Sequence, residues 1–204
     1  MSRQIYKQNV QERTIYKPYI KSLLTTKIPL LITEIGKNVK QNLEKKISSR
    51  VENKCIVEGF IKPNTVKVIS YSSGIVSSEY INFHVVYECM ISHPVEGMII
   101  EATTKTITKA GIHAQVTDEN GNIPITVFIA RDHHHQNSQF NNVKENDNIV
   151  VKVIGQRFEL NDSYICVIAT LENQMENRTV FKKNKPRIVV LENDENIWLL
   201  TKTI

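Results

Sequence analysis

The chain has 204 residues, and its 26 Lys and Arg residues outnumber 21 Asp and Glu residues, giving a formal net charge of +5. This length suits one large domain or two small ones, and the 41% hydrophobic and 23% charged shares exclude a disordered chain. No apolar run approaches the ~20 residues of a membrane helix. The polar start of the chain lacks a leader pattern, so we expect a soluble, intracellular protein with no membrane partner.

The positive charge is concentrated near the start of the chain. Residues 1–50 contain 11 Lys and Arg but 3 Glu, whereas the remaining 154 residues contain 15 basic and 18 acidic groups. Such an excess indicates contact with an acidic partner, either a nucleic acid or an acidic protein face. A solvated helix face following a polar leader explains the same charges equally well.

The three cysteines do not form a metal-binding or disulfide pattern. Cys55, Cys89 and Cys166 are far apart in the sequence, odd in number and without a C-x-x-C pair. A disulfide framework and a zinc knuckle are therefore both disfavoured.

A helix followed by strands is predicted for the first half of the chain. Apolar residues recur every four positions from Ile35 to Ile47, with Thr33 as a plausible N-cap, which predicts a helix over 33–49 with one narrow apolar stripe. Period-two patterns then predict three strands. These strands cover residues 56–61, 66–71 and 81–89. Residues ~20–93 thus form an α+β unit whose antiparallel sheet is covered by the helix.

The second half of the chain is predicted to be all-β. Five short strand patterns occur here, with a long polar connection, 131–147, between the third and the fourth. The strands cover residues 98–108, 112–117, 123–130, 150–159 and 164–171. This number and spacing match an OB-fold barrel. With a boundary at 94–97, we expect an N-terminal domain over 1–95, a five-stranded OB barrel over 96–172 and a C-terminal extension over 173–204.

No motif argues for catalysis. The run His133 to His135 beside Asp132 lacks the spacing that places ligands on one side of an ion, so we predict neither a metal site nor a cofactor. Nucleophile-elbow, phosphate-loop and H-E-x-x-H patterns are also missing from the sequence.

A nucleic-acid-binding surface on the barrel is easier to support. Cations and aromatic residues are mixed along its strands, a combination that binds single strands through phosphate attraction and base stacking. The candidates are Lys105, Lys109, His113, Phe128, Arg131, Lys152, Arg157 and Phe158. Because residues 97–171 contain 6 basic and 8 acidic groups, any such surface must be a local patch. Phe128 and Phe158 lie in strand-like contexts, where burial is the more common outcome.

Two linked stretches resemble a known family. TEIGKNVKQNLEKKISSRVENKC, followed by IVEGFIKP, spans residues 33–63, and a second stretch crosses the domain junction. The junction pattern consists of Phe83, Val85, Tyr87, Pro94, Gly97 and Gly111. Over residues ~20–171 the chain resembles the stalk subunit of multisubunit RNA polymerases. This family comprises the seventh subunit of RNA polymerase II and its archaeal E-prime counterpart, and the chain looks most like the versions in large cytoplasmic DNA viruses.

The resemblance implies a non-catalytic subunit with two working surfaces. A ribonucleoprotein-like tip domain would dock on the largest polymerase subunits, with Gly59, Ile61 and Pro63 facing that core. The OB barrel would contact nascent single-stranded RNA through the face containing Lys105, Lys109, His113 and Phe128. A smaller stalk partner would lie along both domains. A viral protein of this kind acts in the virion and host cytoplasm, and a cellular one in the nucleus.

The sequence departs from the family at one informative place. Family members often have aromatic residues after the barrel glycine, whereas this chain has Ile112 and His113. Two other functions stay open: a free-standing OB-fold RNA-binding protein, and an enzyme that uses the histidine run with a metal.

Overall fold

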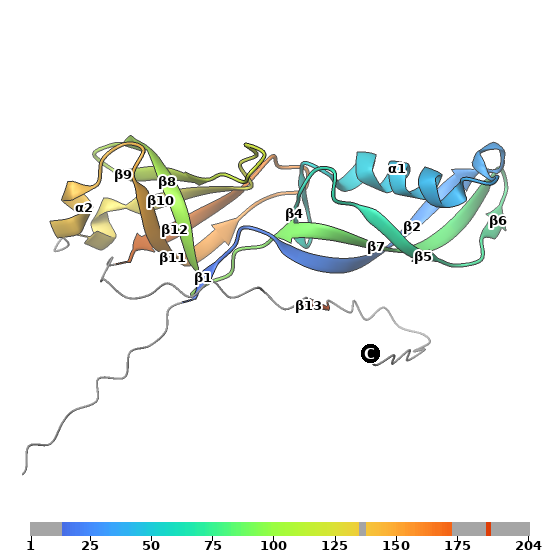
Figure 1. Cartoon of the computed structure of the whole chain (residues 1–204), viewed down its shortest axis with the longest axis horizontal. Coiled ribbons are helices and arrows are strands. Elements are labelled where there is room, and N and C mark those ends of the chain that lie inside the picture. The colour runs from blue at the N-terminus through green and yellow to red at the C-terminus, as the bar shows by residue number, and fades with distance from the viewer. Residues whose placement is uncertain (1–13, 135–137, 173–186, 189–204) are drawn as a thin grey trace, which may run out of the picture.

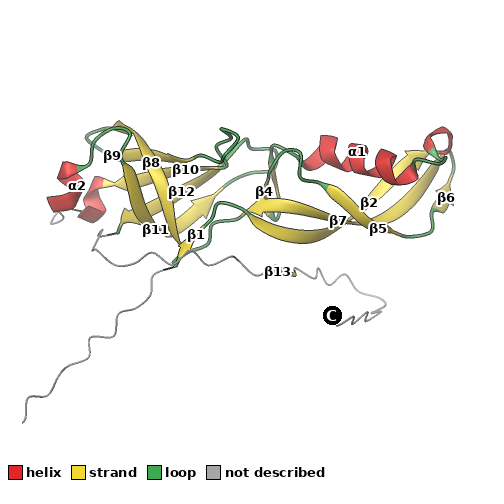
Figure 2. Cartoon of the chain, viewed as in Figure 1, coloured by secondary structure: helices red, strands yellow, loops and turns green. Residues whose placement is uncertain are grey.

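The computed structural model describes residues 14–134, 138–172 and 187–188 of the chain. Two groups of strands lie end to end along an elongated molecule (Figure 1). Strands predominate in the described residues, as Figure 2 shows. The helical elements described are η1 (Ile32–Glu34), α1 (Val39–Val51), η2 (Arg131–His134) and α2 (Ser138–Asn142). No helix among them is long and apolar enough to span a membrane.

The first sheet is built around two long antiparallel strands. These are β2 (Ile20–Leu31) and β7 (Tyr80–Ser92), paired along the whole length of β2. Shorter strands complete the sheet on either side: β3 (Cys55–Ile56), β4 (Gly59–Ile61), β5 (Lys67–Tyr71), β6 (Ile75–Ser77) and β13 (Arg187–Ile188). The strands β4, β5 and β6 pair with β7, whereas β13 pairs in parallel with β2.

Helix α1 packs its apolar stripe against this sheet. Leu43 and Ile47 are fully buried in one cluster with side chains of β2, β5 and β7. Burying each contributes about 1.5–3 kcal/mol. The helix is also held by a polar contact, because the Glu44 carboxylate accepts a hydrogen bond from the backbone N–H of Val68 at 2.9 Å.

Three local details differ from the sequence expectation. The α-helix begins at Val39 rather than at residue 33, where η1 stands instead. The strand expected over 56–61 is instead a hairpin formed by β3 and β4. Gly59 in this hairpin has φ +132°, and an added Cβ there would lie 2.3 Å from the Ser92 carbonyl oxygen. The long strand β2 was not expected, although its burial alternates between exposed and buried residues.

The second sheet closes into a five-stranded barrel, as the sequence predicts. Its strands are β8 (Ile99–Ile107), β9 (Gly111–Val116), β10 (Ile125–Ala130), β11 (Asn148–Arg157) and β12 (Ile165–Leu171). They follow the order β8-β11-β12-β10-β9, and pairing of β8 with β9 closes the ring. The pair β10–β12 is parallel, and a short strand, β1 (Ile15–Tyr16), adds in parallel to β8.

One end of the barrel is filled by the connection expected to be polar. His134 and Phe140 are buried there with their rings stacked at 5.0 Å between centroids. The His134 ring bridges two strands, since its Nδ1 lies 2.9 Å from the Ala130 carbonyl oxygen and its Nε2 accepts the Leu171 N–H at 2.9 Å. The second bond requires an unprotonated Nε2, so Nδ1 carries the proton that is donated to Ala130.

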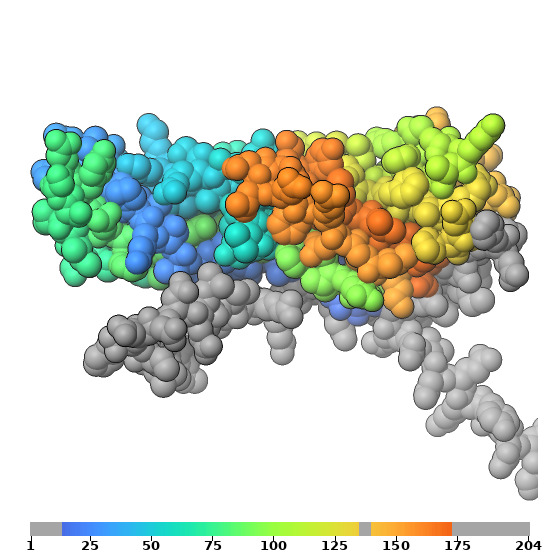
Figure 3. Space-filling model, turned by 180° about the vertical axis from the view of Figure 1, so that it is seen from behind, coloured from blue at the N-terminus to red at the C-terminus, as the bar shows by residue number. Residues whose placement is uncertain are grey.

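The two sheets meet at a junction with buried polar contacts. The backbone of Cys55 exchanges hydrogen bonds of 2.8 Å with Asn161 and Asp162, in the loop between β11 and β12. Figure 3 shows this orange loop packed against the blue-green hairpin. A second contact is the ion pair of Lys62 with Asp118, at 3.5 Å. The expected boundary, 94–97, lies between the end of β7 and the start of β8.

Candidate nucleic-acid interface

Two rings meet on the outer face of the barrel. His113 on β9 is paired in register with Phe128 on β10, and their ring centroids are 4.8 Å apart at an interplanar angle of 45°. The strand alternation places both outward, because their sequence neighbours Ile112, Val127 and Ile129 are buried in the barrel core. His113 is exposed and Phe128 is half-buried. The pair thus presents part of an aromatic surface to solvent.

Gly111 sets how closely the strands approach beside this pair. A Cβ added there would lie 2.3 Å from the Ile129 carbonyl oxygen and 3.0 Å from the Phe128 ring atom Cζ. No other residue type fits without a backbone shift, so this glycine is required by packing.

The outward face continues onto β12 and β11. Phe128 is paired with Ile168, which is 49% exposed, and Thr126 is paired with Cys166, which in turn is paired with Arg157. Neither Ile168 nor Cys166 is among the residues that the sequence predicts for this face. Their alternation in the strand is visible in the sequence, but their place beside Phe128 follows from the parallel pairing of β10 with β12.

Two of the predicted cations lie on elements next to the ring pair, and a third lies farther away on the same face. Lys109 is exposed in the loop between β8 and β9, and Lys105 is exposed where the register of β8 with β9 shifts, next to His113. Arg157 is exposed two strands away from Phe128, with its Nη2 3.2 Å from a carboxylate oxygen of Glu159.

The other predicted residues lie differently. Lys152 is exposed on β11, where it is paired with Thr170 and therefore lies farther along the barrel. Phe158 is half-buried near the junction, with its ring 6.2 Å from that of His93, so it is not part of the face formed by His113 and Phe128.

Arg131 is held within the protein. Its Nε donates to the Lys109 carbonyl oxygen at 2.9 Å and its Nη2 to the Thr108 carbonyl oxygen at 3.3 Å. Its guanidinium carbon also lies 5.0 Å from the centre of the Phe140 ring, which is a cation–π distance.

The histidine run does not form a shared site in the described residues. His134 is buried as described above, His133 is exposed, and His135 lies outside the described residues. Among the residues that the structure describes, no group of three or more His, Cys, Asp or Glu side chains could hold a metal ion.

The residues predicted to face a polymerase core are mostly covered. Ile61 is 0% exposed and Gly59 is buried against Ser92, while Pro63 is half-buried. The Ile61 side chain packs in the core of the first sheet, and the docking role of all three residues stays a prediction.

A different surface of the first sheet is open and apolar. Five large hydrophobic side chains are exposed at the end of this sheet farthest from the barrel, around β6 in Figure 1. These are Leu31, Ile32, Ile75, Val76 and Tyr80. Leu31, Ile75 and Tyr80 form the distal apolar patch on one face of the sheet, since Tyr80 is paired with both Leu31 and Ser77, and Ile75 lies two residues before Ser77. Val76 is paired with Ile81 and points to the other face.

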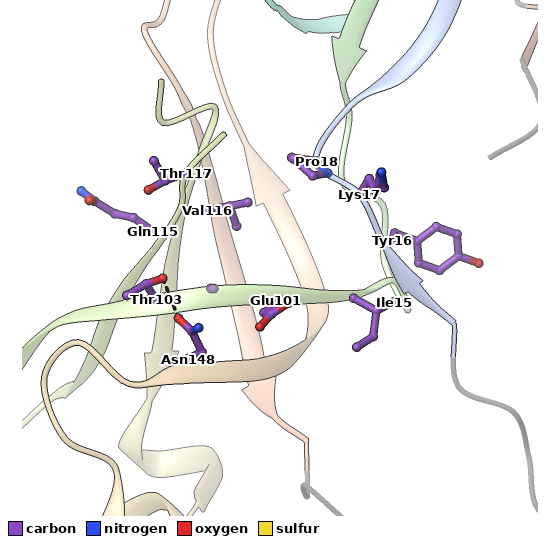
Figure 4. Close-up of a pocket in the computed structure, with 11 residues that line it drawn as sticks. Ile15, Tyr16, Lys17, Pro18, Glu101, Thr103, Gln115, Val116, Thr117 and Asn148 are labelled. Carbon is purple, nitrogen blue, oxygen red and sulfur yellow. Dashed lines mark hydrogen bonds between the residues drawn. The ribbon is translucent and has the colours of Figure 1, made fainter. Parts of the chain in front are cut away.

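A surface pocket of about 330 Å³ lies between residues 15–18 and the outer face of β8 and β9 (Figure 4). Thr103 donates a hydrogen bond to Asn148 at 3.0 Å beside it, and the Glu101 carboxylate adds a negative charge. The Tyr16 ring points away from the neighbouring side chains. Lys17 also lines the pocket, so the lining includes one residue of each charge.

Two of the three thiols are poor nucleophiles. Burial raises the pKa of Cys55 to about 11 and that of Cys89 to about 12, and nearby acidic groups add to both shifts. Both thiols are therefore protonated at neutral pH. Cys166 is exposed.

Comparisons with known proteins agree with the family suggested by the sequence. Over 187 residues, 86% of this chain and 93% of the relative, the sequence is 25% identical to a putative DNA-directed RNA polymerase subunit of Acanthamoeba polyphaga mimivirus. Over 99 residues, 47% of this chain and 52% of the relative, it is 27% identical to subunit 7 of DNA-directed RNA polymerase II of Arabidopsis thaliana. No protein-family model matches the chain. The resemblance to the stalk subunit is therefore confirmed.

Proposed function

From this similarity, we propose that the chain is a non-catalytic stalk subunit of a DNA-directed RNA polymerase. Its first sheet and α1 form a ribonucleoprotein-like tip domain over 1–95 that docks on the largest subunits of the core. Its OB barrel over 96–172 contacts nascent single-stranded RNA. Residues 173–204, assigned to a C-terminal extension, lie outside the described residues except for 187–188. The single observation that carries the proposal is the similarity to a putative polymerase subunit along 86% of the chain.

The distal apolar patch supports docking through the tip. Exposed apolar side chains that lie together are typical of surfaces that another protein covers. Ile75 is 62% exposed, so covering it would contribute about 1–2 kcal/mol at 1.5–3 kcal/mol for a fully buried side chain. We assign the docking contact to this patch rather than to Ile61.

The ring pair and its cations support RNA binding by the barrel. Single strands bind to surfaces where aromatic rings stack with bases and cations attract the phosphates. His113, Phe128 and the exposed Lys109 supply both components on one face. The acidic groups elsewhere on the barrel confine this binding to a patch.

The docking experiment compares two exposed apolar residues. Tagged chain carrying Ile75→Asp should lose co-purification with the two largest polymerase subunits from infected or expressing cells. The matched control is Val57→Asp, because Val57 is 74% exposed but lies in the turn between β3 and β4. Equal recovery of the large subunits by both variants would contradict docking through the distal patch. Recovery of the unaltered chain alone would refute the polymerase role.

The RNA experiment measures affinity for a single-stranded oligonucleotide over a series of salt concentrations. Phe128→Leu keeps an apolar side chain but removes the ring, and it should weaken binding about fivefold or more, since base stacking contributes about 1–3 kcal/mol. Lys144→Ala is the control for charge, because Lys144 is exposed in the connection between α2 and β11. Salt-independent binding, or none, would refute the RNA role of the barrel.

A free-standing RNA-binding protein is the second candidate that the sequence left open. The similarity to polymerase subunits favours the stalk role over it. The relative from a mimivirus also favours a viral origin. We propose that a viral protein of this kind acts in the virion and the host cytoplasm, whereas a cellular one would act in the nucleus. A smaller stalk partner, lying along both domains, belongs to the same proposal.

A further inference from the structure

We infer that Arg131 is a positioning residue, which holds the loop between β8 and β9 so that Lys109 meets an RNA phosphate beside the ring pair. This inference rests on the proposed RNA-binding function of the barrel. It reassigns Arg131, which the sequence suggested as a direct RNA contact.

The guanidinium of Arg131 spans two successive carbonyl groups. Nε and Nη2 donate to the carbonyl oxygens of Lys109 and Thr108, at 2.9 and 3.3 Å. Nη1 lies 3.4 Å from the Asn141 side-chain oxygen, so three of the five N–H donors of the group face protein acceptors. A planar, forked group is needed to reach both carbonyls, and an ammonium group is not a substitute for it.

These contacts join three elements. Arg131 follows the last residue of β10, and its own N–H donates to the Ala110 carbonyl oxygen at 3.0 Å. Its guanidinium also lies over the ring of Phe140 in α2. The loop of residues 108–110 is therefore fixed to the end of β10 and to α2.

Lys109, in contrast, is available to a ligand. Its side chain is exposed, and none of the ion pairs found among the described residues involves its ammonium group. Two residues further on, Gly111 packs against Phe128. A fixed loop thus keeps a free cation next to the proposed base-stacking surface, which reduces the entropy that is lost when the RNA binds.

The test uses Arg131→Lys, which keeps the charge but removes the fork. Lys109→Ala should weaken binding of single-stranded RNA about fourfold at about 0.15 M salt, because one phosphate contact contributes a salt slope of about 0.7. Arg131→Lys should cause a loss of the same size and the same reduction in slope. The double variant should bind no more weakly than Lys109→Ala, because both changes act on one contact.

A matched substitution and a structural measurement accompany the affinities. Arg50→Lys makes the same exchange at an exposed arginine in the last turn of α1, outside the barrel, and should leave affinity nearly unchanged. Hydrogen exchange at the amides of residues 109–111 should become faster in Arg131→Lys, while exchange in the core strands stays the same.

The outcomes separate the two proposals. RNA affinity of Arg131→Lys equal to that of the unaltered chain, or losses that add in the double variant, would overturn the positioning role while leaving RNA binding intact. Unchanged exchange at residues 109–111 would overturn it as well. An unaltered chain that binds no RNA would refute the proposed function of the barrel, and the inference with it.

Discussion

The Lys62–Asp118 ion pair connects the two halves of the molecule, and its removal should destabilise both. Lys62 follows β4 in the first sheet, and Asp118 lies in the turn between β9 and β10. Their side chains are 18% and 3% exposed, and the Lys62 ammonium also lies 5.0 Å from the centre of the Tyr19 ring. We consider the substitution Lys62→Met, which keeps the apolar stem and removes the charge.

The size of the loss in stability depends on the hydrogen bonds that the Asp118 carboxylate keeps when the Lys62 charge is removed. Breaking a buried ion pair by removing one partner costs about 3–5 kcal/mol. The Asp118 carboxylate still accepts three hydrogen bonds, from the backbone of Asn120 and from the backbone and side chain of Asn122, at 2.8–3.0 Å. We therefore expect a loss of about 2–3 kcal/mol in the free energy of unfolding, or roughly 4–12 °C in Tm.

The pH dependence of stability should identify Asp118 as the group involved. Burial acts to raise the pKa of this carboxyl, but the hydrogen bonds from Asn122 and Asn120 and the charge of Lys62 outweigh it, so the pKa is lowered. A lowered pKa contributes stability above the usual carboxyl value of about 3.9, and this contribution is lost as pH falls through the pKa of the folded state. Asp118→Asn should remove that part of the acid dependence.

Urea unfolding at a series of pH values measures both effects. The control is Lys21→Met, because the Lys21–Glu88 pair is shorter, at 2.7 Å, but its side chains are 57% and 26% exposed. A pair exposed in this way contributes about 0–1 kcal/mol. If Lys62→Met were no more destabilising than Lys21→Met, or if Asp118→Asn kept the full acid dependence, the reasoning would be wrong.

Three further outcomes are expected. In the folded protein at neutral pH, a thiol reagent should modify the exposed Cys166 quickly. Cys55 and Cys89 should react only after denaturation, because burial raises the pKa of both thiols. Mass spectrometry of the labelled peptides distinguishes these cases. Gly111→Ala should cost about 1–3 kcal/mol, because the added methyl group meets the Ile129 carbonyl oxygen. Thermal unfolding checks this against Gly36→Ala, where Gly36 is exposed and an added Cβ meets no atom within 4 Å. Ile47→Ala should cost about 2–5 kcal/mol in urea unfolding, since its side chain is 0% exposed under α1.

Local patterns in the sequence were enough to predict the barrel strands. From β8 to β12, apolar side chains alternate with polar ones, and each strand ends near a turn signal. The two-residue repeat and the positions of the turn residues therefore predict the same strands. The core-facing residues of α1 were also predictable, because Leu43 and Ile47 are four positions apart on a helical face.

Strand β2 shows where this reasoning failed. Its buried residues alternate, but Pro29 and two threonines weaken the pattern, and Pro within a run usually argues against a strand. Pro29 is tolerated because β2 pairs with β7 along one edge, while the pairing found on its other edge, with β13, is at Ser22 and Leu23. That arrangement depends on β7, about 50 residues away in the sequence.

Composition and periodicity thus determine that this chain folds and where most of its strands lie, because these properties depend on neighbouring residues. The roles of individual polar side chains depend on partners brought together by folding. Arg131 and His134 look like surface residues in the sequence, yet one holds a loop and the other bridges β10 and β12. Ile168 joins the candidate RNA-binding face only because β10 and β12 run in parallel, a pairing that no local pattern encodes.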